Sequence, residues 1–438
     1  MVLGIQELSM KGKSPFQYGW VIVGVSFVSL GLVYGVWYAF SVFFVALLKE
    51  FGWSRSMGAG AFSFCVIVSS TISPFVGGMV YSIGPKKVIV SGVLILGVGL
   101  GLCSLMQTWW QFYLFFSLIA AAGIGAAGWV PNVMIIQDWF REKRGLATGI
   151  ISAGIGTGIL VCVPAVQYLI IQFGWRTAYQ VLAIFIPIII ISMAVAFLKK
   201  PPQAAESNPV EVGISRTFIK DPLVVNEEWV SRTWSVRQAL RTKQLWLLGI
   251  SFFLGNLITQ SVFTHQVAFF VDHGMNALVA SYVVGLIGIM SVGGKTLWGG
   301  LSDKIGREII HTLGLACSML SMILLILFSV FSLPIMTYFF SLFFALGYAV
   351  TAAHPPLITA DIFGGQAFGK IFGFLMILIG AGGAFGAWFT GFIFDLTGSY
   401  VPAFVVLILC ALYACMNVWW AAPGKIRRVP GKAKSVPH

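Results

Sequence analysis

Apolar runs of about 18 residues or more recur along the whole of this chain, and each is long enough to cross a bilayer as a helix. Of its 438 residues 58% are hydrophobic and only 9% are charged, whereas an average soluble domain has roughly 25% charged residues. A soluble fold with this composition would expose far too much apolar surface. The runs are also too long and too rich in glycine for the alternating strands of a membrane barrel. We therefore predict an all-α integral membrane protein.

The apolar runs number twelve and fall into two groups of six, with a polar stretch between them. The expected spans cover residues 18–45, 57–80, 87–106, 110–137, 145–171 and 177–198, and then 243–270, 278–301, 309–331, 334–356, 367–394 and 400–421. The predicted organisation is a tail over residues 1–17, an N-terminal six-helix bundle over 18–198, a linker over 199–242, a C-terminal six-helix bundle over 243–421 and a tail over 422–438. The linker is charged and has no apolar period, so we expect part of it to be disordered.

Lysine and arginine, 27 in all, gather at one set of loops and tails. If both termini are cytoplasmic, only Lys49, Arg55 and Arg176 fall in outer loops. Cytoplasmic loops of membrane proteins are enriched in positive residues. We therefore expect both termini on the cytoplasmic side of a multi-pass protein, in a bacterial inner membrane. Because this topology accounts for much of the net charge of +13, the expected surroundings are a lipid bilayer and not a nucleic acid.

Other chemistries find little support in the sequence. The six cysteines lie in apolar runs without a Cys-x-x-Cys pair, which is typical of small buried side chains. Gly123-Ile-Gly125-Ala-Ala-Gly128 matches a dinucleotide-binding pattern, but no strand precedes it. Because we find no metal-ligand spacing and no nucleophile–base pair, we expect no enzyme, no cofactor and no metal.

The two groups of spans repeat each other at an offset of 222 to 224 residues. The matching pieces are Gly77-Gly78 and Gly84 with Gly299-Gly300 and Gly306, Glu50-Phe51-Gly52 with Asp272-His273-Gly274, Pro131 with Pro355, Gly145 with Gly369, and Gly174 with Gly398. The repeat predicts two pseudo-symmetric six-helix bundles. Parallel repeats of this kind place the substrate site between the halves, near the middle of the bilayer.

A glycine-rich charged turn marks the second half. Gly-Gly-Leu-Ser-Asp-Lys-Ile-Gly-Arg over residues 299–307 is similar to the signature loop of the major facilitator superfamily (MFS), and the resemblance covers about residues 18–421. Its glycines allow helices to approach closely, and its charges can latch neighbouring helix ends. The first-half copy has Tyr81 where an acidic residue is expected, so we expect an acidic latch in the second half alone.

Within that superfamily the chain resembles the monocarboxylate and oxalate/formate transporter branch. The resemblance is carried by Tyr18-Gly19-Trp20, Tyr34-Gly35-Val36-Trp37-Tyr38, Phe51-Gly52-Trp53-Ser54-Arg55, Trp139-Phe140, Arg144-Gly145-Leu146-Ala147, Gly174-Trp175-Arg176 and Phe394-Asp395-Leu396-Thr397-Gly398-Ser399-Tyr400. It implies a secondary active transporter that moves a small organic anion, above all a monocarboxylate, by alternating access. The implied coupling partner is a proton or a counter-anion.

Lys295 is the leading candidate for the substrate site. A charge at the centre of a membrane helix costs at least about 2.5–3.5 kcal/mol, which makes it a functional candidate by default. It stands four residues before Gly299, where the branch usually places a basic residue that holds the carboxylate. Alternatively, Lys295 reaches toward Asp303 at the inner surface. Ser291 stands where monocarboxylate transporters often have an acidic partner, so the carrier of the coupling ion stays open.

Four further residues complete the predicted substrate site: His265, Tyr34, Tyr38 and Asn132. Each has a structural alternative, namely a hydrogen-bonded histidine, helix packing for the tyrosines, and an amide that satisfies backbone freed near Pro131. His354 and Tyr348 are additional candidates. Asp138, Asp361 and Asp395 are expected to cap or latch helix ends, and Asp272 and His273 are expected to be solvated.

Two other functions are compatible with the sequence. The aromatic content would suit an exporter of hydrophobic compounds. A membrane sensor that does not transport is the second alternative, although no soluble signalling domain is recognisable.

Overall fold

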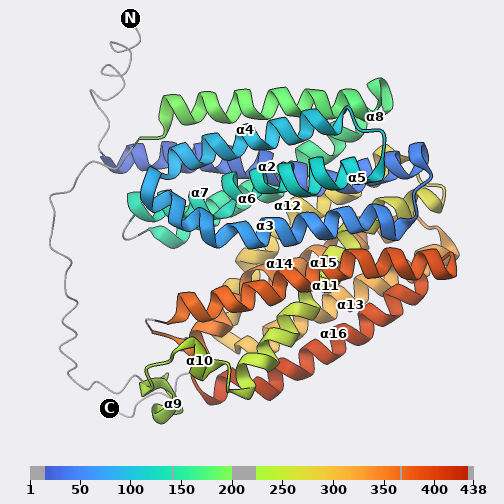
Figure 1. Cartoon of the computed structure of the whole chain (residues 1–438). Coiled ribbons are helices and arrows are strands. Elements are labelled where there is room, and N and C mark those ends of the chain that lie inside the picture. Colours follow the sequence, from blue (N-terminus) through green and yellow to red (C-terminus); the bar gives the residue numbers. More distant parts are fainter. Residues whose placement is uncertain (1–14, 141–142, 200–222, 366, 433–438) are drawn as a thin grey trace, which may run out of the picture.

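The computed structural model describes residues 15–140, 143–199, 223–365 and 367–432, and within them the chain is almost entirely helical (Figure 1). The helices of the first half are α2 (Pro15–Phe51), α3 (Arg55–Ile83), α4 (Pro85–Cys103), α5 (Trp109–Phe112), the π-helical η1 (Tyr113–Ala120), α6 (Ala121–Ala127), α7 (Trp129–Trp139) and α8 (Arg144–Phe197). Those that follow are α9 (Glu227–Ser231), α10 (Val236–Ala239), α11 (Lys243–Asp272), α12 (Ala277–Ile305), α13 (Arg307–Phe331), α14 (Ile335–Phe363), α15 (Phe368–Thr397) and α16 (Val401–Ala421).

Among the described residues, 11 helical segments are long and apolar enough to cross a membrane. One of them, α8, has 54 residues and would be ~80 Å long if straight, more than twice the hydrocarbon thickness of a bilayer. It is interrupted at Gly174, whose φ of 81° and ψ of 160° are not helical. It therefore contains two helices of membrane-spanning length, as predicted on either side of this glycine, which makes twelve such helices in the described chain.

The internal repeat reappears in the backbone. Helices α3 and α12 each have 29 residues, and each ends at a glycine with positive φ: 86° at Gly84 and 113° at Gly306. L-residues avoid this conformation, so the tight turn that starts the next helix requires glycine. Two other predicted pairs share a positive φ, namely Gly52 with Gly274 and Gly174 with Gly398. The matched conformations confirm that the spacing of these glycines reflects a structural repeat.

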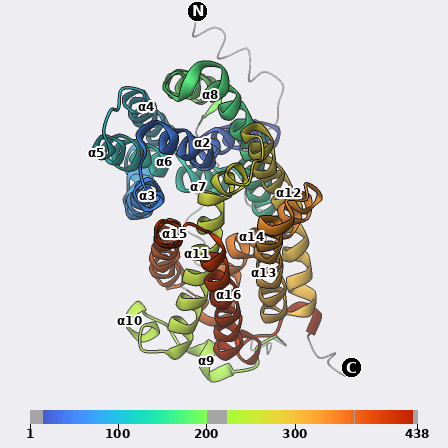
Figure 2. The same ribbon diagram turned by 90° about the vertical axis from the view of Figure 1, so that its right-hand side faces the viewer.

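The helices form two groups, α2–α8 and α11–α16, which lie side by side (Figures 1 and 2). Their boundary is made chiefly by α3 against α15 and α8 against α12. Gly156 and Gly288 let α8 and α12 touch, because a Cβ on Gly288 would lie 2.6 Å from the Gly156 carbonyl oxygen. We call the end where α8 ends and α11 begins the linker end, and the end where α2 ends and α3 begins the far end. The ribbons of the two groups converge at the far end in Figure 1.

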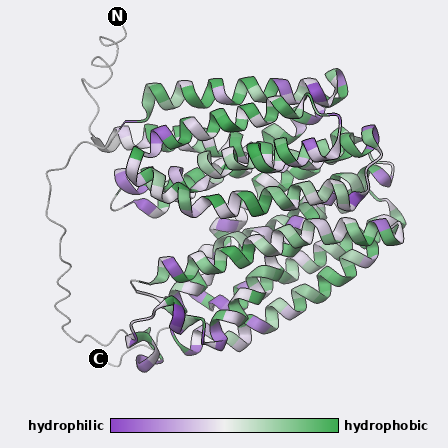
Figure 3. Cartoon of the chain, in the orientation of Figure 1, coloured by the Kyte–Doolittle hydropathy of each residue, from purple (hydrophilic) through white to green (hydrophobic). Residues whose placement is uncertain are grey.

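The outer faces of the helices are apolar (Figure 3). Large hydrophobic side chains that are mostly exposed include Val161, Phe185, Ile188, Ile377 and Leu409. Such a surface suits lipid, as the composition predicts. The six cysteines are unpaired thiols within the helices, which agrees with their predicted role as small apolar side chains.

Part of the predicted linker is ordered. Residues 223–242 contain α9 and α10, and Val224 forms an isolated antiparallel bridge with Arg427 in the C-terminal tail. The backbone N–H of Gly424 donates to Glu308 Oε1 at 2.7 Å, which fastens the tail to the start of α13. The prediction of disorder for the rest of the linker falls on residues 200–222, which lie outside the described chain.

Candidate functional site

Lys295 lies on α12 at the boundary between the two groups of helices and is partly exposed. Its Nζ stands 5.1 Å from the ring centroid of Tyr348, a cation–π contact. Asp303, the alternative partner, instead forms an ion pair with Arg307 at 2.8 Å. Over the described chain no carboxylate pairs with Lys295.

Tyr348 on α14 meets Tyr38 on α2, so the two halves touch beside Lys295. Their hydroxyl oxygens are 2.9 Å apart and buried. Phe263 on α11 completes the cluster, with ring centroids 4.5 Å from Tyr38 and 5.1 Å from Tyr348. The predicted residues Lys295 and Tyr38 are therefore brought together by Tyr348, which the sequence offered only as an additional candidate.

Tyr34 lies one turn from Tyr38, toward the linker end. A Cβ on Gly128 would be 3.5 Å from its hydroxyl oxygen, so this side chain faces the break between α6 and α7. Its ring centroid is 6.4 Å from that of Trp37. Tyr34 thus adds a second hydroxyl from α2 near the Tyr38–Tyr348 contact.

Asn132 is buried, and its side chain forms hydrogen bonds to the backbone. Its Nδ2 donates to the carbonyl oxygens of Ala127 (2.9 Å) and Gly128 (2.8 Å). The Ala127 carbonyl needs this donor because Pro131, four residues later, has no N–H. The helix breaks at Gly128, three residues before Pro131, since the ψ of Gly128, −136°, is not helical. The other polar atom of this side chain, Oδ1, has no partner in the described structure, and the role of Asn132 toward a substrate stays a prediction.

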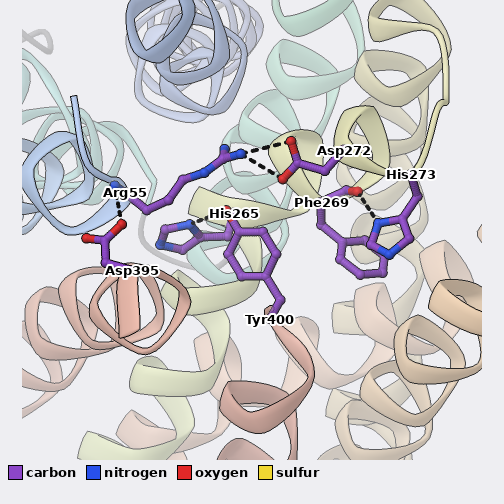
Figure 4. A network of polar contacts seen from close by, with 7 residues as sticks. All are labelled: Arg55, His265, Phe269, Asp272, His273, Asp395 and Tyr400. Atoms are coloured by element: carbon purple, nitrogen blue, oxygen red, sulfur yellow. Dashed lines mark hydrogen bonds and ion pairs between the residues drawn. The ribbon is translucent and has the colours of Figure 1, made fainter. Parts of the chain in front are cut away.

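His265 does not lie beside Lys295, and its role toward a substrate stays a prediction. It is two residues from Phe263 and so lies on nearly the opposite face of α11. Its Nε2 donates to the Ala387 carbonyl at 2.8 Å, and its Nδ1 accepts from the Tyr400 hydroxyl at 3.3 Å (Figure 4). The fully buried ring therefore ties α11 to α15 and Tyr400, which matches the structural alternative.

An ionic network joins the two halves at the far end (Figure 4). Arg55 Nη2 donates to both carboxylate oxygens of Asp272, at 2.8 and 2.7 Å. The backbone N–H groups of Arg55 and Ser56 donate to the two oxygens of Asp395, at 2.7 and 2.8 Å. Asp395 thus caps α3 from across the boundary. Asp272 is exposed, as predicted, and it is also paired with Arg55 from the other half.

A second latch ties helix ends to one another within the second half, at the linker end. Arg307 Nη1 pairs with Asp303 at 2.8 Å, and its Nε pairs with Asp361 at 2.8 Å. The predicted latch at the signature loop is thereby confirmed. In the first-half copy Tyr81 is 86% exposed, and it supplies no comparable charge.

The arrangement around Lys295 is suited to a small anion. An ammonium group and phenolic hydroxyls can donate to a carboxylate, while the aromatic rings exclude water and strengthen that attraction. The ammonium and hydroxyl groups come from both halves of the chain, so a ligand bound here would contact both halves.

Comparisons with known proteins agree with this architecture. The model of the family described as the Major Facilitator Superfamily matches residues 26–360. Monocarboxylate transporter 13 of Bos taurus is 26% identical over 404 residues, which cover 89% of this chain and 86% of the relative. The oxalate:formate antiporter of Oxalobacter formigenes is 25% identical over 289 residues, 66% of this chain and 64% of its own. A bacterial homologue of the human lysosomal transporter Spinster, solved inward-facing and unoccupied, has a TM-score of 0.65 at 14% identity and covers 95% of this chain and 97% of its own.

Proposed function

Because this chain belongs to the Major Facilitator Superfamily, we propose that it is a secondary transporter of a small organic anion, with monocarboxylates as its substrate class. The superfamily and the named relatives are transporters, so the chain is a transporter and not an enzyme. Relatives named for monocarboxylates, oxalate and formate support an anionic substrate.

The observation that carries the proposal is Lys295, a cation between the halves that meets a ring instead of a carboxylate. An unpaired charge inside a membrane protein is expensive, so a functional counter-charge is expected. The substrate carboxylate supplies it. Lysine acts as a point charge without the planar fork of arginine, which suits small acids of different shape.

The tyrosines supply hydrogen bonds to the same carboxylate. In the Tyr38–Tyr348 contact one O–H donates to the other oxygen, so the second O–H is still free to donate. Tyr34 offers a further hydroxyl one turn away. His265 and Asn132 act indirectly in this scheme, by fixing α11 and the α6–α7 break.

In alternating access, the two six-helix bundles and the Arg55 network control which side of the membrane the substrate site opens to. The linker end faces the cytoplasm with both termini, as the positive loops favour, and residues 18–198 rock against residues 243–421. The Arg55 network then holds the outer end shut, so the present conformation opens inward. The inward-facing state named for the Spinster homologue supports this assignment. Coupling is by proton symport or anion exchange, in a bacterial inner membrane.

The test is uptake of radiolabelled lactate, pyruvate, formate and oxalate by proteoliposomes that contain the purified protein. We expect saturable uptake of at least one acid, and a loss of about tenfold or more in Lys295→Ala, because a charge-assisted hydrogen bond disappears. Lys370→Ala, which removes an exposed lysine on α15, is the matched control and should be neutral.

Other outcomes separate the alternatives. No uptake of any acid, or undiminished uptake by Lys295→Ala, would overturn the anion site. Competition by an apolar cation such as tetraphenylphosphonium would indicate an exporter of hydrophobic compounds. Binding of an acid without flux would indicate a sensor.

A further inference from the structure

Two histidines lie buried beside each other inside the second half, apart from the residues assigned to the substrate. His311 is on α13 and His354 is on α14, and their ring centroids are 6.3 Å apart with the planes inclined by 29°. Their exposed fractions are 1% and 0%. Packing alone does not explain histidine at these two positions, because two apolar rings would fill the space without a desolvation penalty.

The hydrogen bonds of the pair are incomplete. Ser251 Oγ donates to the Ala414 carbonyl at 2.9 Å, so its oxygen can accept from His311 Nε2 at 3.2 Å. His311 then carries its hydrogen on Nε2, and Nδ1 is a bare acceptor. This Nδ1 has no hydrogen-bond partner in the described structure, and neither ring nitrogen of His354 has one within normal hydrogen-bond geometry, although the backbone of Trp298 on α12 lies close to His354. Two lone pairs, one on His311 Nδ1 and one on the unprotonated ring nitrogen of His354, are therefore available to bind a proton.

The pair lies between the candidate substrate site and the linker end. His354 follows Tyr348 by six residues, which places it about 9 Å further along α14. At the next level Arg307 is paired with Asp361. Along α14 the order is thus the Lys295–Tyr348 contact, the histidine pair, and the latch of the signature loop.

The charges around the pair come from three helices. Arg307 on α13 and Asp303 on α12 act on His354, and Asp361 on α14 offsets Arg307. Lys295 on α12 stands on the substrate side. The neighbouring part of α16 contributes Cys415, next to the Ala414 that binds Ser251. Asp303 and Asp361 are both paired with Arg307, and Arg427 also acts on Asp361, so these carboxylates have cationic partners of their own. A proton on the histidine pair would add one positive charge on the linker side of the anion site.

We propose that His311 and His354 form the proton site of a proton–anion symporter, an inference that rests on the proposed function. A proton from water on one side binds an imidazole nitrogen to give an imidazolium, and it leaves to water on the other side when the carboxylate does. The proton and the carboxylate together carry no net charge. On loading, an N–H bond of the imidazolium forms as an O–H bond of hydronium breaks, and release reverses this exchange. The imidazolium strengthens anion binding at Lys295, and by linkage the bound anion strengthens proton binding to the same degree. The pair thereby takes the place of the acidic partner that is missing at Ser291.

The experiment uses proteoliposomes that contain pyranine and the full-length protein, with the same four acids as probes. In the wild type, acid outside should drive uptake, with about tenfold accumulation per pH unit at one proton per anion, and the lumen should acidify as the anion enters. His354→Gln and His311→Gln keep size and hydrogen bonding but do not titrate. We expect each to lose the response to the pH gradient and the lumenal acidification, while exchange of labelled for unlabelled acid at equal pH persists. His273→Gln, at the far end, is the matched control.

The outcomes are separable. Retention of gradient-driven uptake and acidification in the double variant overturns the proton site. Wild-type exchange without any proton entry overturns it too, and leaves the proposed function intact. Loss of exchange together with gradient-driven uptake makes the histidines structural and likewise counts against the proposal. A wild type that moves none of the acids removes the proposed function and this inference with it.

Discussion

Arg55 and Lys295 are both cations at the boundary between the two halves, and they differ in what neutralises them. Arg55 meets the carboxylate of Asp272 with two hydrogen bonds, and Asp395 binds the backbone beside it. Lys295 meets only the face of Tyr348 among the groups that the structure describes. One site is electrostatically complete, and the other is not.

We infer from this difference that Arg55 stabilises a conformation, whereas Lys295 binds a ligand. A cation whose counter-charge is built into the protein fixes two segments relative to each other, as Arg55 does for α3 and α11. A cation without a built-in counter-charge attracts one from outside. The comparison therefore assigns the far end to gating and the Lys295 cluster to substrate, and the following predictions test that division in order of decreasing effect.

The largest effect is expected for Lys295→Gln. Loss of a charge-assisted hydrogen bond of about 1.5–3 kcal/mol should weaken binding of a transported acid roughly 10- to 100-fold. The fold should survive, because no protein carboxylate is left unpaired. Ligand-induced thermal shift of the purified variant measures this loss. A variant that melts well below the wild type without ligand would show that Lys295 has a structural role after all.

A smaller effect, on conformation and not on affinity, is expected for Arg55→Gln. The partly exposed ion pair with Asp272 is worth about 1 kcal/mol, so the equilibrium should shift about fivefold toward opening of the far end. Distances between spin labels at residues 49 and 276 report this opening. Asp272→Asn in the Arg55→Gln background should add nothing, since the interaction is already absent.

Tyr348→Phe should weaken acid binding by a few-fold. It removes one neutral hydrogen bond, worth about 0.5–1.5 kcal/mol, and keeps the ring beneath Lys295. Tyr179→Phe is the matched control, because its buried hydroxyl has no hydrogen-bond partner in the described chain and lies outside the site. The measurement is uptake at a subsaturating acid concentration. Equal losses in both variants would show that the Tyr348 hydroxyl does not bind the substrate.

The smallest effect is expected for Arg176→Gln. Its ion pair with Glu50 spans 2.8 Å, yet both side chains are 44% exposed and both belong to the first half. Water screens such a pair, and it does not cross the boundary. Uptake and melting temperature should stay at the wild-type values. A clear loss of transport would show that gating at the far end extends beyond Arg55.

Much of the fold was predictable because its causes are local. Hydrophobic runs predict the spans, including the division of α8 at Gly174, and the paired glycines predict the positive-φ turns. The latch of Arg307 with Asp303 was also predictable, since the two residues are one helical turn apart. The candidate site was predictable in part: Lys295 stands out because a charge in an apolar helix is rare. The assignment of gating to the far end and of substrate binding to the Lys295 cluster stays a proposal.

The remaining features are decided by contacts between residues far apart in the chain. Nothing near Asp272 in the sequence indicates that Arg55 reaches it, and nothing near Tyr38 indicates Tyr348. The same holds for His265, which the fold turns toward Ala387, and for His311, which it sets beside His354. The sequence by itself determined the membrane helices, the repeat and the presence of an intramembrane cation, because hydrophobicity, glycine conformation and charge act locally. Only the tertiary structure decided which charges are neutralised within the protein, because that depends on how twelve helices pack together.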